Sequence, residues 1–198
     1  FMKKLFIIII LSLCFTTPSH TNDISDFQIE GVSVGDSALD YFSKEEIEKA
    51  FSIVISSYNS DKFKRALFFS SNFEIYDAIM IHSKKIDKTY KIYSLSSVLE
   101  FPKDFKNCNI KKKEIVSDLK NTFFDYKINE FENRELKQDK EGQSFANDTT
   151  FKFNDGSSAR VFCYNWSNEA EQKGFLDHLR ISLNSKEFNI WLNNEAYK

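Results

Sequence analysis

One small group of residues in the sequence could do chemistry. Asp177, His178 and Arg180 lie within four consecutive positions, and an imidazole beside a carboxylate and a guanidinium group could act as a base or hold an anion. Successive side chains of a strand point to opposite faces, so His178 and Arg180 would share a face that Asp177 does not. This favours anion binding, and the three residues are catalytic candidates for the alternative in which the protein is a hydrolase or lyase.

Two aromatic residues are candidates for a binding surface. Tyr164 and Trp166 alternate along a predicted strand and would share one face, where rings line a ligand surface or pack in a core. His82 lies at the end of a predicted strand, near Lys84 and Lys85, which favours a position at the protein surface. We find no nucleophile elbow, glycine-rich phosphate loop or metal-ligand spacing. The sequence therefore predicts no metal and no cofactor, and it favours a protein that is not an enzyme.

The N-terminal residues have the pattern of a cleavable secretory signal. Two lysines precede a run of 11 uncharged, mostly apolar residues (5–15), and small or polar residues follow as far as Thr21. A charged start, a short apolar stretch and a small-residue exit are typical of such signals. The run is shorter than the roughly 20 apolar residues that a membrane-spanning helix needs. We therefore expect residues 1–21 to be removed, with a cleavage site uncertain by a few residues.

What remains, residues 22–198, is predicted to be one periplasmic or secreted domain. Cys14 could carry a lipid anchor, but Leu13 occupies the position where lipidation requires a small residue, so anchoring is the less favoured alternative. Loss of the signal leaves 25 basic and 29 acidic residues, a net charge of −4, which argues against a nucleic-acid partner. The 21 phenylalanines and the excess of lysine over arginine fit either the codon usage of an AT-rich genome or an aromatic binding surface.

Hydrophobic periodicity and turn signals predict an α+β fold. Helices are predicted at 44–52, at 109–124 and after Ser185, which is a helix cap. Strands are predicted at 26–34, 64–70, 74–83, 90–99, 149–153, 159–166 and 179–183. Residues 125–148 are mostly polar and are predicted to be a flexible loop. Adjacent strands with segregated helices imply a mainly antiparallel sheet, in the order strand, helix, three strands, long helix, three strands, helix.

Two cysteines lie beyond the signal, and each has apolar or aromatic neighbours. In an oxidising compartment, Cys108 and Cys163 could close a disulfide bond. The alternative is a pair of separate buried thiols. Export favours the bond, so the sequence predicts one disulfide.

Several stretches together resemble small secreted proteins of marine alphaproteobacteria, a group without an assigned activity. They are residues 27–37, 41–43, 90–94, 163–167 and 177–180. The resemblance extends over most of the chain beyond residue 21, and it also implies a Cys108–Cys163 pair. Residues 31–47 resemble the start of outer-membrane assembly accessory domains and of β-lactamase-inhibitor-type domains.

These observations predict an exported module that binds a small molecule or an envelope protein. A small secreted hydrolase or lyase with a site near His178 is one alternative, and an envelope assembly accessory or inhibitor-like protein is another. The two predicted halves share the plan of three strands followed by a helix, although their residues do not match.

Overall fold

The structure is a computed structural model, and it describes residues 23–53, 58–69, 72–137, 139 and 142–198. The predicted signal and Cys14 lie outside these residues. The described part is an α+β fold, as the sequence predicted, with four α-helices and two antiparallel sheets. Within the described ranges, no helix is long and apolar enough to cross a membrane.

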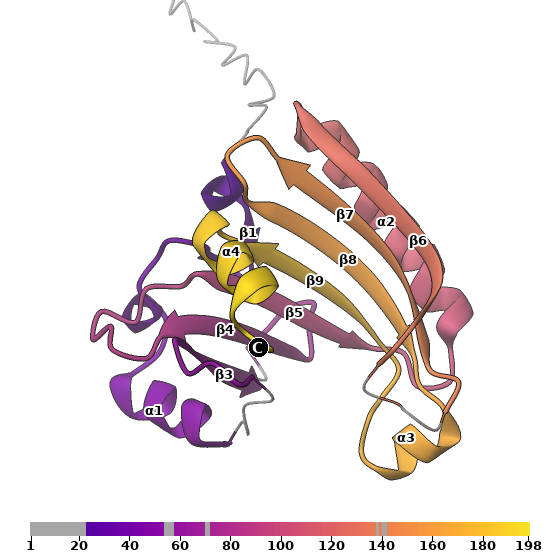
Figure 1. Cartoon of the computed structure of the whole chain (residues 1–198), viewed down its shortest axis with the longest axis horizontal. Helices are drawn as coiled ribbons and strands as arrows, with labels where there is room; N and C mark the ends of the chain where they lie inside the picture. The colour runs from indigo at the N-terminus through magenta and orange to yellow at the C-terminus, as the bar shows by residue number, and fades with distance from the viewer. Residues whose placement is uncertain (1–22, 54–57, 70–71, 138, 140–141) are drawn as a thin grey trace, which may run out of the picture.

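The main sheet has seven strands in the order β3-β4-β5-β9-β8-β7-β6 (Figure 1). Every neighbouring pair in this sheet is antiparallel. The strands are β3 (Phe63–Phe69), β4 (Ala78–Lys84), β5 (Ser94–Glu100), β6 (Tyr126–Glu135), β7 (Phe145–Phe153), β8 (Ser158–Asn165) and β9 (His178–Asn184). The other sheet is a small hairpin of β1 (Gln28–Ile29) and β2 (Val32–Ser33).

Two antiparallel meanders meet in the middle of the main sheet. The first contains β3, β4 and β5, the second contains β6 to β9, and their last strands, β5 and β9, pair with each other. Ser96 lies opposite Ser182 at this junction, and their hydroxyl oxygens are 2.9 Å apart. Because strand order fixes which side chains can meet, this junction brings the two halves of the chain onto one surface.

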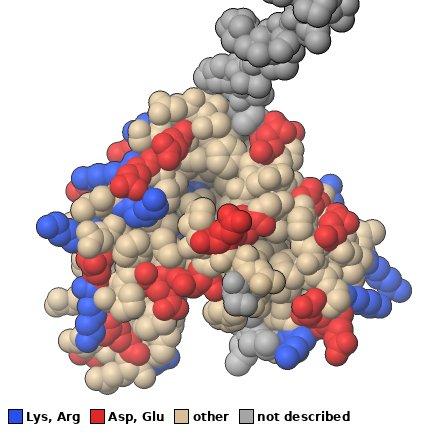
Figure 2. Space-filling view, turned by 180° about the vertical axis from the view of Figure 1, so that it is seen from behind, with Lys and Arg blue, Asp and Glu red and all other residues tan. Residues whose placement is uncertain are grey.

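One face of the sheet is apolar and is covered by the two longer helices, α1 (Lys44–Ile53) and α2 (Phe105–Thr122). Alternate strand residues point into this core, among them Ile79, Leu95, Leu179 and Val161, all of them fully buried. Seen from this side, acidic and basic side chains are interspersed over the surface (Figure 2). The helix side therefore presents no large area of a single charge.

The predicted disulfide is present between Cys108 of α2 and Cys163 of β8. Their Cα atoms are 5.9 Å apart and 55 residues separate them in the sequence. Asp104 caps α2 by accepting a hydrogen bond from the Asn107 amide. The helix thus begins at Phe105, four residues before the predicted start, and Cys108 lies in its first turn.

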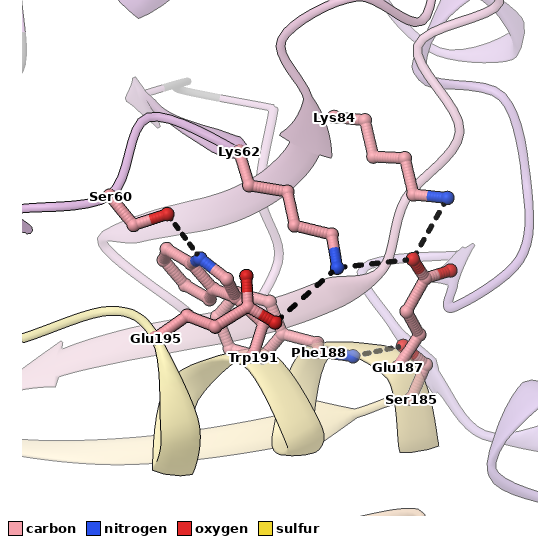
Figure 3. Close-up of polar contacts among 8 residues, drawn as sticks. All are labelled: Ser60, Lys62, Lys84, Ser185, Glu187, Phe188, Trp191 and Glu195. Carbon is pink, nitrogen blue, oxygen red and sulfur yellow. Dashed lines mark hydrogen bonds and ion pairs between the residues drawn. The ribbon is translucent and has the colours of Figure 1, made fainter. Parts of the chain in front are cut away.

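The opposite face of the sheet carries one helix, α4 (Lys186–Asn194), which Ser185 caps as predicted. Trp191 of α4 is fully buried. Its indole Nε1 donates a hydrogen bond to Ser60 Oγ at 3.0 Å (Figure 3). Lys62 and Lys84 form ion pairs with Glu187, and Lys62 also pairs with Glu195 (Figure 3). These contacts attach α4 to the edge of the sheet near β3.

Some sequence-based expectations were wrong in detail. The expected loop at 125–148 contains the ten-residue strand β6 and the start of β7. As an edge strand, β6 pairs on one side only, so its backbone bonds to β7 form although most of its side chains are exposed and polar. The expected strand at 26–34 is the β1–β2 hairpin. A short helix, α3 (Asn168–Gln172), was not predicted.

Candidate functional site

A cavity of about 500 Å³ lies on the face of the sheet that carries α4. Its floor is formed by small polar side chains of the central strands β5 and β9, namely Ser94, Ser96, Ser182 and Asn184. Larger side chains stand around this floor, from α4 and the C-terminus on one side and from the end of β6 on the other. The hollow exists because these four positions carry small side chains while the positions around them carry arginine and aromatic residues.

All four arginines of the protein line this one cavity. They are Arg65 on β3, Arg134 on β6, Arg160 on β8 and Arg180 on β9. The chain has 27 basic residues, the other 23 being lysines, and Lys137 is the one lysine among the described lining residues. Glu135 is the one acidic residue in that lining. The cavity is therefore strongly positive in a protein whose overall charge is negative.

Aromatic rings position these guanidinium groups. The Arg160 guanidinium carbon lies 4.4 Å from the centroid of the Phe162 ring, and that of Arg180 lies 5.2 Å from the Tyr164 ring. The guanidinium carbon of Arg134 lies 5.8 Å from the centroid of the same Phe162 ring. Stacking of this kind stabilises an arginine without neutralising it, so the charge stays available to a ligand.

Two of the arginines have no acidic partner within the described part of the chain. No carboxylate there lies within 4.0 Å of the Arg160 or Arg180 guanidinium group. Arg160 Nε donates to Thr150 Oγ1 at 3.1 Å, whereas Arg180 Nε is buried without a hydrogen-bond partner among the described residues. A half-buried guanidinium group without an anion is costly, and an anionic ligand would compensate for that cost.

Asp148 organises the end of the cavity near β6. It is almost fully buried on β7, and its Oδ2 accepts a hydrogen bond from Arg134 Nε at 2.5 Å. Burial lowers the pKa of Arg160, and the charge of Asp148 opposes this effect. Asp148 therefore holds one arginine in place and helps to keep its neighbour protonated.

His82 lies in the wall of the cavity and not at the protein surface as expected. Its side chain is buried, and Nε2 lies 3.2 Å from the Tyr58 hydroxyl. Burial, followed by the charges of Arg65 and Arg180, lowers the pKa of His82 to about 3. Burial also raises the pKa of Tyr58 to about 12. At neutral pH both groups are uncharged, so they suit hydrogen bonding to a ligand better than proton transfer.

The structure separates the three residues that the sequence placed together. Arg180 lines the cavity, whereas His178 packs its ring against Tyr164, with centroids 4.5 Å apart, and hydrogen-bonds the Leu176 carbonyl through Nδ1. Burial, followed by the charge of Arg180, lowers the pKa of His178 to about 4. Asp177 instead accepts a hydrogen bond from the Trp166 amide at 2.7 Å. The Asp177 carboxylate and the His178 ring thus have different hydrogen-bond partners, and the three side chains do not converge.

The two aromatic candidates also have different places. Tyr164 lines the cavity and carries Arg180 over its ring. Trp166 stacks between Tyr164 and Phe175, with centroid distances of 5.9 and 4.4 Å, and it does not contribute to the cavity lining. Within the described residues, no group of three or more His, Cys, Asp and Glu side chains could hold a metal ion.

Reasoning from the sequence found one of the four arginines and missed the other three. The sequence feature that could have identified them is the scarcity of arginine. In a chain whose other basic residues are lysines, each arginine marks a position where a planar guanidinium group could matter. They are distant in the sequence, and only the pairing of seven strands brings them together.

Comparisons with protein-family models, curated proteins and solved structures give no match to this chain.

Proposed function

We propose that this protein is an exported binding module, without catalytic activity, that holds an anionic ligand in the arginine-lined cavity. The observation that carries the proposal is that every arginine in the chain borders one cavity. Arginine presents a planar fork of donors that matches carboxylate and phosphate groups. The volume of about 500 Å³ is within the range of small-molecule sites.

Export is supported by the signal-like N-terminus and by the disulfide bond, which is typical of proteins outside the cytoplasm. Binding is favoured over hydrolysis or elimination because the buried histidines are poor bases. The pKa values of His82 and His178 are lowered to about 3 and about 4, far below the range in which a general base works best at neutral pH.

The proposal is tested by titrating the protein with citrate, a small polycarboxylate, in a thermal-unfolding assay and by calorimetry. Binding at 100 times the dissociation constant adds roughly 2.7 kcal/mol of stability, which corresponds to an increase in Tm of about 5–10 °C for a domain of this size. The increase should shrink with added salt because the attraction is electrostatic.

The decisive variants are Arg160→Gln and Arg180→Gln, each of which should abolish most of this increase. Lys113→Gln removes the same charge from an exposed position on α2, outside the cavity, and should leave the increase unchanged. If citrate, acetate and inorganic phosphate all fail to bind, or if the arginine variants bind them as well as the native protein does, the proposal is wrong.

A further inference from the structure

The cavity has a basic side, which contains Arg160 and Arg180, and an aromatic side formed by other elements. On the basic side, Arg160 of β8 is paired with Ser182 of β9, and Arg180 of β9 is paired with Phe162 of β8. Arg160 and Arg180 are thus diagonal neighbours on one face of the sheet, roughly 7–8 Å apart at the backbone. No carboxylate of the described residues lies within 4.0 Å of either guanidinium group. One oxyanion placed between them would therefore meet two guanidinium groups.

The aromatic side is formed by β4, by α4, and by the segments that precede β3 and follow α4. Its lining side chains are Tyr58, Met80, His82, Phe188 and Tyr197. The ring centroids of Tyr58 and Tyr197 are 5.4 Å apart, and those of His82 and Phe188 are 4.6 Å apart. Arg65 is the one arginine on this side of the described lining, and its guanidinium carbon lies 5.9 Å from the centroid of the Tyr58 ring. This side is therefore mainly uncharged.

The floor between the two sides consists of polar side chains that satisfy one another. Ser94 Oγ donates a hydrogen bond to Asn184 Oδ1 at 2.7 Å, and the hydroxyl oxygens of Ser96 and Ser182 are 2.9 Å apart. The aromatic side on β4 is separated from Arg180 on β9 by one strand, β5. Two spacings between strands amount to roughly 10 Å. A ring joined by a short chain to an acid group spans this distance.

We propose that the ligand is an organic anion with one oxyanion group, bound between Arg160 and Arg180, and an apolar, ring-containing body that lies against the aromatic side. This inference rests on the proposed function and specifies its ligand class. An apolar body would remove the aromatic side from water, a hydrophobic gain that a small inorganic anion lacks. A heavily hydroxylated body would instead lose hydrogen bonds to water on that side.

The test is calorimetric titration of the protein with 3-phenylpropionate, acetate and gluconate, each of which carries one carboxylate. Gluconate is similar in size to 3-phenylpropionate but has hydroxyl groups in place of the ring. We expect 3-phenylpropionate to bind at least tenfold more tightly than the other two. Carboxylate and phosphate groups share the chemistry that arginine recognises, so phenyl phosphate is also compared with inorganic phosphate. A preference for the ring in either comparison supports the proposal, and the tighter ring-bearing anion identifies the acid group.

Variants on the aromatic side test where the body lies. Tyr197 is 58 % exposed, so Tyr197→Ala should leave the fold intact. This variant should lower the affinity for 3-phenylpropionate at least threefold and leave the affinity for acetate unchanged. Met80→Gln, a polar change of similar size on β4, should have the same effect. The matched control is Phe69→Ala, which removes a ring that is 70 % exposed and lies outside the cavity lining, and it should change neither affinity.

The outcomes separate this inference from the proposed function. A preference for 3-phenylpropionate that persists unchanged in both Tyr197→Ala and Met80→Gln would overturn the inference, because the body would then lie elsewhere. Ring-bearing anions that bind no more tightly than acetate, gluconate and inorganic phosphate would overturn it too but leave the proposed function intact. Absence of binding by every oxyanion, or binding that Arg160→Gln and Arg180→Gln leave unchanged, would overturn both.

Discussion

At the scale of single residues, the cavity depends on arginine and not merely on positive charge. Arg160 and Arg180 are held against aromatic rings in an orientation that a flexible ammonium group would not share. Most basic positions in the chain are lysine, so its use of arginine here indicates a demand for planar, two-point hydrogen bonding.

This demand gives a prediction for Arg180→Lys and Arg160→Lys in the native background. Each change keeps the charge but removes the planar fork, so citrate affinity should fall by about tenfold, or roughly 1.4 kcal/mol. Calorimetry at fixed ionic strength measures the loss. Unchanged affinity would mean that net charge alone attracts the ligand.

The buried histidines predict how stability changes with pH. Their folded-state pKa values, about 3 for His82 and about 4 for His178, lie below their ordinary value of 6.5. The unfolded chain therefore binds protons first, and stability is full above pH 6.5 and is lost as the pH falls toward 4. Between pH 6.5 and 5, each histidine should lower the free energy of unfolding by about 1.6 kcal/mol.

Urea unfolding at several pH values measures this slope. The variant His82→Gln should reduce the change of unfolding free energy with pH by about half. The double variant with His178→Gln should reduce it further. The pH range from 5 to 6.5 lies above the range in which ordinary carboxylates titrate. An equally steep slope in the double variant would show that other groups cause the loss.

At the scale of elements, helix α4 forms a wall of the cavity and is attached mainly by Trp191. The ring of Trp191 contacts Tyr58, Phe63 and Phe188, with centroids 4.9–5.3 Å apart. The ion pairs of Lys62 and Lys84 with Glu187 are at least one-quarter exposed and contribute little. Aromatic packing therefore positions the wall.

Trp191→Ala should destabilise the protein by about 3–5 kcal/mol, the usual range for a buried aromatic residue. Ile190→Ala in the same helix is the control, because Ile190 is 47 % exposed and should cost less than about 1 kcal/mol. Urea titration of both variants measures the difference. A similar loss of unfolding free energy in both variants would contradict the conclusion that Trp191 provides most of the attachment of α4.

At the scale of the whole molecule, the disulfide joins the helix layer to the sheet. The bond between Cys108 and Cys163 connects α2 with β8, and β8 carries Arg160, Phe162 and Tyr164 on its other face. The strand that supplies much of the cavity wall is thus covalently tied to the helix behind it.

Reduction, or the double variant Cys108→Ser with Cys163→Ser, should lower the free energy of unfolding by about 4 kcal/mol, as loop closure over this separation predicts. Unfolding curves with and without reductant measure the loss. Mass spectrometry after alkylation should show that neither Cys108 nor Cys163 is alkylated before reduction. Two alkylated cysteines without reductant would contradict the bond.

The sequence by itself determined the features that depend on local periodicity. Alternation along β9 assigns His178 and Arg180 to one face of the sheet, and the capping serine before residue 186 marks the start of α4. The antiparallel α+β architecture also followed from turns and strand patterns. The Cys108–Cys163 bond was predicted because the expected export would place these two cysteines in an oxidising compartment.

Only the tertiary structure decided which strands are neighbours and what they enclose. Edge strand β6 lacked a sequence signal, because a strand paired on one side can be polar on both faces. The cavity likewise depends on β5 pairing with β9 across 86 residues between Ser96 and Ser182. Backbone hydrogen bonds between distant strands do not require particular side chains, so the convergence of four arginines is a property of the assembled sheet.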